Sequence, residues 1–442
     1  MSFSLRCPRS GNTISGFLQI RKLTHLDRMT GRGLFCGVAL VLAQQAAAAV
    51  EPYDATVIAP VSALDIFASA QSTYNDNIYN LPQDVSVSDI GLGTRASRAD
   101  LIETGALGLN GDWQVGYQEF FAQLQVDYNR FQHNDTLNNA STDDKLQWNW
   151  RIGPRLSGKL YSSYGQGLAS FANTQFFSKD IVKTTAQYGE IDWEVGPHWI
   201  LKGSGRRATT AHSAELLSAN DFSSNAGTFG LNYVSGKGDE IGWEYRRLRG
   251  SFPHAPIGDD LLVNRAYSED AGTFHADYQL TGKTAFTGRV GYLRRRYENP
   301  DAAGREGDFS GTVWRAGLQW QPGAKTQLVL SGWRDLTAYI DAQSDYFVAT
   351  GATIASIWNA TEAISLSLSG SREREAYVST NLGLAFTDNR RDEVTSAQGL
   401  LVWTPRTAFS VRLAYHYTNR DSTAAAFDYK YDTYSLELRL TL

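Results

Sequence analysis

The sequence contains only two cysteines, Cys7 and Cys36, and none after residue 36. The rest of the chain therefore has no disulfide framework, no zinc–cysteine site and no cysteine nucleophile. A chain without cysteine is typical of a protein that folds after export, because it cannot form wrong disulfides in an oxidising compartment.

Long apolar runs are also missing. No run reaches the ~18 residues that a membrane helix needs. The longest, residues 34–43, follows Arg32 and precedes an alanine-rich end at 46–49. A positive residue, a short apolar core and small residues predict a secretory signal peptide over 1–49. Met29 is a plausible start, so 1–28 are an extended leader or, as we favour, a gene-start artefact.

The mature chain is acidic, because most of the charged residues that are removed with the signal peptide are basic. This balance argues against nucleic acid as a partner. Enzyme motifs such as G-x-S-x-G and H-E-x-x-H are absent. We therefore expect no enzyme, no catalytic or metal site and no cofactor. If the chain were an enzyme, His275 and His416 would be the residues to test.

What the sequence does contain is period-two alternation. Over residues 146–156 every second residue is apolar, and the run ends at a Gly-Pro turn. Residues 433–442 repeat the pattern to the last position. Successive side chains of a strand point to opposite faces, so such segments have one apolar face and one polar face. A sheet of these strands can close with lipid outside and water inside.

Eight short turns alternate with nine longer loops along the chain, which gives eighteen strands. The first turn is predicted at residues 110–112. The fold class is therefore an all-β transmembrane antiparallel up-and-down barrel over residues 64–442, after a short periplasmic segment at 50–63. Segments 349–358 and 397–403 alternate poorly, so sixteen strands remain an alternative. No predicted loop much exceeds about 17 residues, so we expect a wide bore or plugging by other means.

Aromatic residues recur where strands enter the short turns, and we expect them to form the periplasmic girdle. They are Trp150, Trp193, Tyr233, Tyr278, Trp320, Trp358 and Trp403.

The polar face of the strands should line the lumen, because charge on the lipid face costs about 2–4 kcal/mol for Arg or Lys near the midplane. The predicted lining residues are Gln125, Asp127, Lys145, Asn149, Arg151, Asp192, Glu244, Arg246, Asp277, Arg289, Arg315, Arg412 and Arg439. Such a wall suits a hydrated sugar chain, although any water-filled lumen must be polar.

Arginines are also dense at the outer ends of the strands that run towards the outside. These are Arg206, Arg207, Arg246, Arg247, Arg249, Arg294, Arg295, Arg296, Arg372 and Arg374. They could guide an anionic polymer or bind the phosphates of lipopolysaccharide, and we favour the second interpretation slightly.

The segment 74–82 carries a Tyr-x-Asp-Asn-aliphatic-aromatic-x-Leu-Pro motif, formed by Tyr74, Asp76, Asn77, Ile78, Tyr79, Leu81 and Pro82. It resembles the opening of exosortase-associated exopolysaccharide outer-membrane proteins of the EpsL type, within the broader group of β-barrel porins. The resemblance implies a role in producing or exporting an exopolysaccharide and supplies no catalytic residues. The terminal Leu442 departs from the Phe or Trp that commonly ends such barrels.

The leading hypothesis is a passive outer-membrane conduit for an extracellular polysaccharide. Its expected partners are outer-membrane lipid, lipopolysaccharide, the polymer itself, and periplasmic and inner-membrane export machinery. A general diffusion porin is the main alternative, followed by a barrel enzyme and a structural anchor.

Overall fold

The computed structural model describes residues 63–174, 176–254, 266–298, 308–341, 344–378 and 390–442. The predicted signal peptide at 1–49 and nearly all of the segment 50–63 lie outside these residues. Among the helices within them, none is long and apolar enough to cross a membrane.

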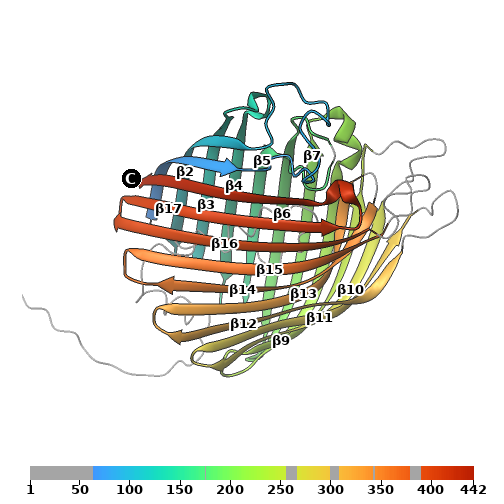
Figure 1. The fold of residues 1–442 in the computed structure, drawn as a ribbon. Helices are drawn as coiled ribbons and strands as arrows, with labels where there is room; N and C mark the ends of the chain where they lie inside the picture. The colour runs from blue at the N-terminus through green and yellow to red at the C-terminus, as the bar shows by residue number, and fades with distance from the viewer. Residues whose placement is uncertain (1–62, 175, 255–265, 299–307, 342–343, 379–389) are drawn as a thin grey trace, which may run out of the picture.

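Eighteen antiparallel strands form one closed sheet, as predicted (Figure 1). Each strand pairs with its neighbour in sequence, and β1 pairs with β18 from Phe67–Thr441 to Asn75–Thr433, which closes the barrel. The strands are β1 Ala63–Asn75, β2 Asp100–Val115, β3 Gln118–Phe131, β4 Asn139–Ile152, β5 Leu156–Leu168, β6 Ile181–Val195, β7 Trp199–His212, β8 Phe222–Val234, β9 Glu240–Ser251, β10 Tyr267–Thr281, β11 Thr284–Tyr297, β12 Phe309–Gly323, β13 Thr326–Asp341, β14 Ser344–Asn359, β15 Ile364–Val378, β16 Arg391–Arg406, β17 Phe409–Ser422 and β18 Tyr429–Thr441.

The two ends of the barrel differ as expected. Eight short turns and the C-terminus lie at one rim, and nine connections lie at the other. Eight of these nine are longer, whereas only two residues separate β13 from β14, so the long loop predicted there is wrong. Three of the long connections contain 3-10 helices: η1 Asp135–Leu137, η2 Glu215–Asn220 and η3 Ala425–Phe427. In bacterial barrels the short turns face the periplasm, so the other rim is extracellular.

Apolar side chains cover the outside of the wall. On β18, Leu436, Leu438 and Leu440 are exposed, whereas the polar residues between them are partly covered. Of the seven predicted girdle residues, all except Trp150 are exposed at the rim with short turns. The wall is therefore apolar towards lipid and polar towards the lumen.

The predicted turn at 110–112 is wrong, because these residues lie within β2 and the chain reverses at Gly116 and Tyr117. Gly116 has φ +64°, which a turn glycine adopts without steric cost. Gly111 is required for packing instead: a Cβ there would lie 2.3 Å from the ring of Trp113.

Candidate functional site

The thirteen residues predicted to line the lumen all lie on the strand face opposite the exposed apolar residues. Most of the charged ones are paired with a neighbour on the same face. The ion pairs and their N–O distances are Lys145–Asp143 2.8 Å, Arg151–Glu194 3.5 Å, Lys202–Asp192 3.9 Å, Arg246–Glu269 3.1 Å, Arg289–Glu244 3.8 Å, Arg315–Asp335 3.7 Å and Arg412–Glu437 3.2 Å.

The remaining predicted residues also have neighbours on this face. Gln125 donates to Asp127 at 2.8 Å, and Asn149 accepts from Gln147 at 2.9 Å. The guanidinium of Arg439 lies 3.5 Å from the ring centroid of Phe67, and Asp277 lies in register with Glu240. The inner wall is thus polar, with most of its charges compensated locally.

The two histidines that would be tested if the chain were an enzyme do not lie in one site. His275 on β10 lies between Glu240 and Glu244, with N–O distances of 3.5 and 3.4 Å. His416 on β17 contacts Thr418 and Tyr431 instead. Within the described residues, no group of three or more His, Cys, Asp or Glu is arranged to hold a metal ion.

The motif at 74–82 folds into a compact turn over the seam between β1 and β18. The amide of Asn77 donates to the carbonyls of Leu81 and Lys430 and accepts from the backbone N–H of Leu81. Asp76 accepts a hydrogen bond from the backbone N–H of Asp432. The turn therefore fastens the first extracellular loop to the last strand.

This loop, residues 76–99, packs with the loops that follow β3 and β5. Tyr79 and Leu81 are buried in a cluster with Leu137 and Phe171. Burial and the carboxylate of Asp100 raise the pKa of Tyr79 to about 12, so its phenol stays protonated and donates to Asn134 at 3.0 Å. The first three extracellular loops thus form one apolar unit at the rim.

The loop after β5 also contacts a strand that is not its neighbour in the sheet. The guanidinium of Arg420, on the inward face of β17, donates to the carbonyl of Ala172 at 2.8 Å and to the side chain of Asn173 at 2.7 Å. Strands β18, β1, β2, β3 and β4 separate β17 from β5 in the sheet. This short loop therefore folds inward at the mouth. The expectation of a wide bore or plugging by other means stays a prediction.

The upper end of the β13–β14 hairpin narrows the mouth from another side. Tyr346 and Phe347 are consecutive in a strand, yet both are buried. Tyr346 packs with Ala271 and Leu293 on the inward face of β10 and β11, whereas Phe347 packs with Tyr377 of β15. Because both faces are covered, this part of the hairpin lies inside the surrounding wall.

Three buried arginines at the mouth were missed as a set by sequence reasoning. Arg295 pairs with Glu269 and lies over the ring of Tyr267. Arg390 pairs with Asp392, while Arg420 pairs with Glu375 and Asp392. Strand parity could have placed Arg295 and Arg420 inside, but nothing in the sequence indicates which distant loop Arg420 meets.

The other outer-end arginines divide between the two faces. Arg206 and Arg246 point inward like Arg295, whereas the following have the parity of the lipid-facing residues and are exposed: Arg207, Arg247, Arg249, Arg294, Arg296, Arg372 and Arg374.

A closed eighteen-stranded antiparallel barrel with an apolar outer wall and a polar inner wall is a porin-like β-barrel of the bacterial outer membrane. Residues 266–442, from the start of β10 to the C-terminus, match the family described as Putative beta-barrel porin 2. No curated protein matches the chain.

Solved structures with a similar fold share little sequence with it. OccK2 (OpdF) of Pseudomonas aeruginosa in complex with glucuronate is 11% identical, with a TM-score of 0.45, covering 86% of this chain and 97% of that one. A BenF-like porin from Pseudomonas fluorescens Pf-5 has the same identity and TM-score, covering 86% and 98%. The FrpB iron transporter of Neisseria meningitidis is 10% identical, with a TM-score of 0.47, covering 82% and 62%.

Proposed function

We propose that this barrel conducts an extracellular polysaccharide from the periplasm to the cell surface. The observation that carries the proposal is the inner wall, where carboxylates, amides and guanidinium groups line the lumen in locally compensated pairs. Such a wall offers hydrogen bonds to hydroxyl-rich chains without a strong net field that would select small ions of one sign. The resemblance of segment 74–82 to exopolysaccharide proteins supports the same substrate class.

Aromatic residues near the mouth add a second contact that suits sugars. Tyr267, Tyr297 and Tyr346 form a continuous series of ring contacts, with centroids 5.6 and 6.5 Å apart. The flat faces of such rings can pack against the C–H faces of sugar rings. In the structure these rings contact one another, so their faces become available to sugar rings only when the mouth elements move.

The alternative function is diffusion of small solutes, and the inward-folded loop at Ala172 and Asn173 favours it. A narrow mouth excludes a polymer unless the loop opens. The two functions therefore differ in whether the loop moves during transport.

Recordings from the purified full-length protein in planar bilayers separate the two functions. We expect low resting conductance and reversible block when purified polysaccharide from the same cells is added on the periplasmic side. Dextran of matched size serves as the control polymer. A stable, unselective conductance that neither polymer blocks would favour the porin.

In cells, deletion of the gene should trap polymer in the periplasm, and normal surface polysaccharide would contradict the proposal.

A further inference from the structure

The outer wall of β7–β11 carries a regular row of arginines at its extracellular side. Arg207, Arg249 and Arg296 point outward from alternate strands and are exposed. Cα pairing places them in one row across the sheet, separated by Asn225 of β8 and Ser268 of β10. Because adjacent strands lie about 4.8 Å apart, neighbouring arginines are separated by about 10 Å.

These three arginines differ from Arg247, Arg372 and Arg374 of the same outer wall, which have acidic partners. Arg247 lies 4.0 Å from Asp270, and Arg372 and Arg374 both pair with Glu393. Among the residues that the structure describes, no carboxylate lies within ion-pair distance of Arg207, Arg249 or Arg296. The row is therefore an uncompensated positive strip on a wall that faces lipid.

The row lies at the level where lipid headgroups are expected. Trp199 begins β7 at the periplasmic rim, and Arg207 follows eight residues later. A β-strand crosses the apolar core with about 9–11 residues. Arg207 thus lies near the outer boundary of the membrane, where anionic headgroups would meet it.

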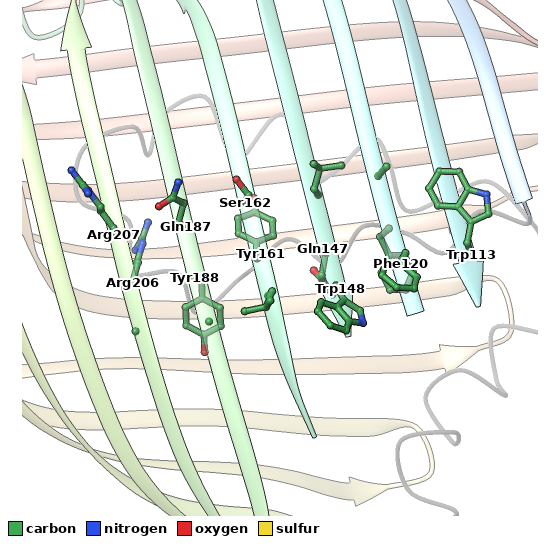
Figure 2. Close-up of a pocket in the computed structure, with 16 residues that line it drawn as sticks. Trp113, Phe120, Gln147, Trp148, Tyr161, Ser162, Gln187, Tyr188, Arg206 and Arg207 are labelled. Carbon is green, nitrogen blue, oxygen red and sulfur yellow. The ribbon is translucent and has the colours of Figure 1, made fainter. Parts of the chain in front are cut away.

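An apolar groove of about 920 Å³ begins at Arg207 and crosses the outer wall to Trp113 near the periplasmic end of β2 (Figure 2). Its lining includes Trp148 and Leu160, and the neighbouring strands contribute Gly189 and Gly205. A Cβ on Gly205 would have only one atom within 4 Å, the carbonyl oxygen of Ala226 at 4.0 Å. Gly205 therefore leaves an open depression, whereas a Cβ on Gly189 would lie 3.3 Å from the side chain of Leu160.

We propose that this surface binds a phosphorylated glycolipid of the outer leaflet, with its phosphates on the arginine row and one acyl chain in the groove. Guanidinium groups bind phosphate oxygens through paired hydrogen bonds, and Asn225 adds a neutral donor between two of them. A second copy of the chain fits less well, because it would bring the same positive row against itself. The proposal concerns the outer wall and does not depend on what passes through the lumen.

Native mass spectrometry of the full-length barrel in detergent tests the site, with bis-phosphorylated lipid A as the probe and the same lipid without phosphates as its control. The combined variant Arg207→Gln/Arg249→Gln/Arg296→Gln should bind lipid A at least tenfold more weakly than the native protein. The matched control Arg372→Gln/Arg374→Gln, on another part of the outer wall, should change binding less than twofold. If the triple variant fails to insert, Arg249→Gln alone should weaken binding about threefold.

The groove is tested separately by Gly205→Leu, which fills the depression and should reduce lipid A binding at least threefold. Gly272→Leu, at an outward glycine of β10 outside the groove, is the control and should leave binding unchanged. Equal binding of lipid A to the native protein and the triple variant would overturn the proposal. Equal binding of phosphate-free lipid to the native protein would do so as well. A dimer that Gly205→Leu abolishes, with lipid binding unchanged, would show that a second copy occupies the groove.

Discussion

Replacement of Arg420 by Gln should open the extracellular mouth. The native guanidinium donates two hydrogen bonds to the loop after β5, at 2.8 Å to Ala172 and 2.7 Å to Asn173. A hydrogen bond from a charged donor contributes about 1.5–3 kcal/mol, so both together hold the loop with about 3–6 kcal/mol. Since 1.4 kcal/mol is a factor of ten, the ratio of open to closed mouth should rise at least about 100-fold.

Single-channel recording in planar bilayers measures this ratio directly from the time spent at each conductance level. Arg412→Gln is the matched control, because Arg412 lies on the same face of β17 and pairs with Glu437 without touching the loop. Arg390 still pairs with Asp392 in the Arg420 variant, so the carboxylate of Asp392 keeps a cation. Identical open times in the Arg420 and Arg412 variants would refute the assignment of the loop as the closing element.

Three further outcomes follow from the wall and its loops. Leu438→Arg, on the lipid-facing side of β18, should lower the free energy of unfolding in lipid vesicles by about 2–4 kcal/mol, whereas Ser435→Arg, on the inward face, should cost less than about 1 kcal/mol. Asn77→Ala removes three hydrogen bonds of the seam turn, so hydrogen exchange at residues 76–82 should accelerate at least tenfold, while exchange in β9 stays unchanged. Burial alone would raise the pKa of Asp180, but hydrogen bonds from His212, Ala214 and Ser213 outweigh it and lower the pKa. Its contribution to the stability of the loop after β7 is therefore present above the unfolded pKa of about 3.9 and lost as the pH falls through the lower folded pKa. Proteolysis of the loop after β7 should rise in that acidic range in the native protein, whereas the Asp180→Asn variant should be equally susceptible at every pH tested.

Alternation predicted the barrel because the outer and inner walls impose opposite chemistry on consecutive residues. The predicted count of eighteen strands is confirmed even where the alternation of apolar and polar residues is poor. Around Ala349 of β14 the alternation fails because Phe347 and Tyr346 are buried on opposite faces of the same hairpin. Period-two patterning cannot identify a strand that has apolar surroundings on both sides. The eighteen-strand count nevertheless followed from the turns on either side.

The errors came from interactions that are not local. The Asn-Gly-Asp sequence at 110–112 is a strong turn signal, but pairing with β3 continues through it and the ring of Trp113 covers Gly111. The position of the loops at the mouth depends on contacts between residues far apart in sequence, such as Arg420 and Asn173, which are 247 residues apart. No composition or spacing rule encodes that pairing, so sequence reasoning could place Arg420 inside the barrel but could not foresee which loop it contacts.

Cysteine labelling of β18 tests the account most directly, because the chain has no native cysteine after residue 36. Single cysteines at Leu436, Glu437, Leu438 and Arg439 can be treated in vesicles with a charged, water-soluble maleimide and with a lipid-soluble one. We predict that cysteines at 437 and 439 react with the charged reagent and that those at 436 and 438 react only with the lipid-soluble one. Reaction of all four with the charged reagent, or the reverse alternation, would contradict a barrel with lipid outside and water within.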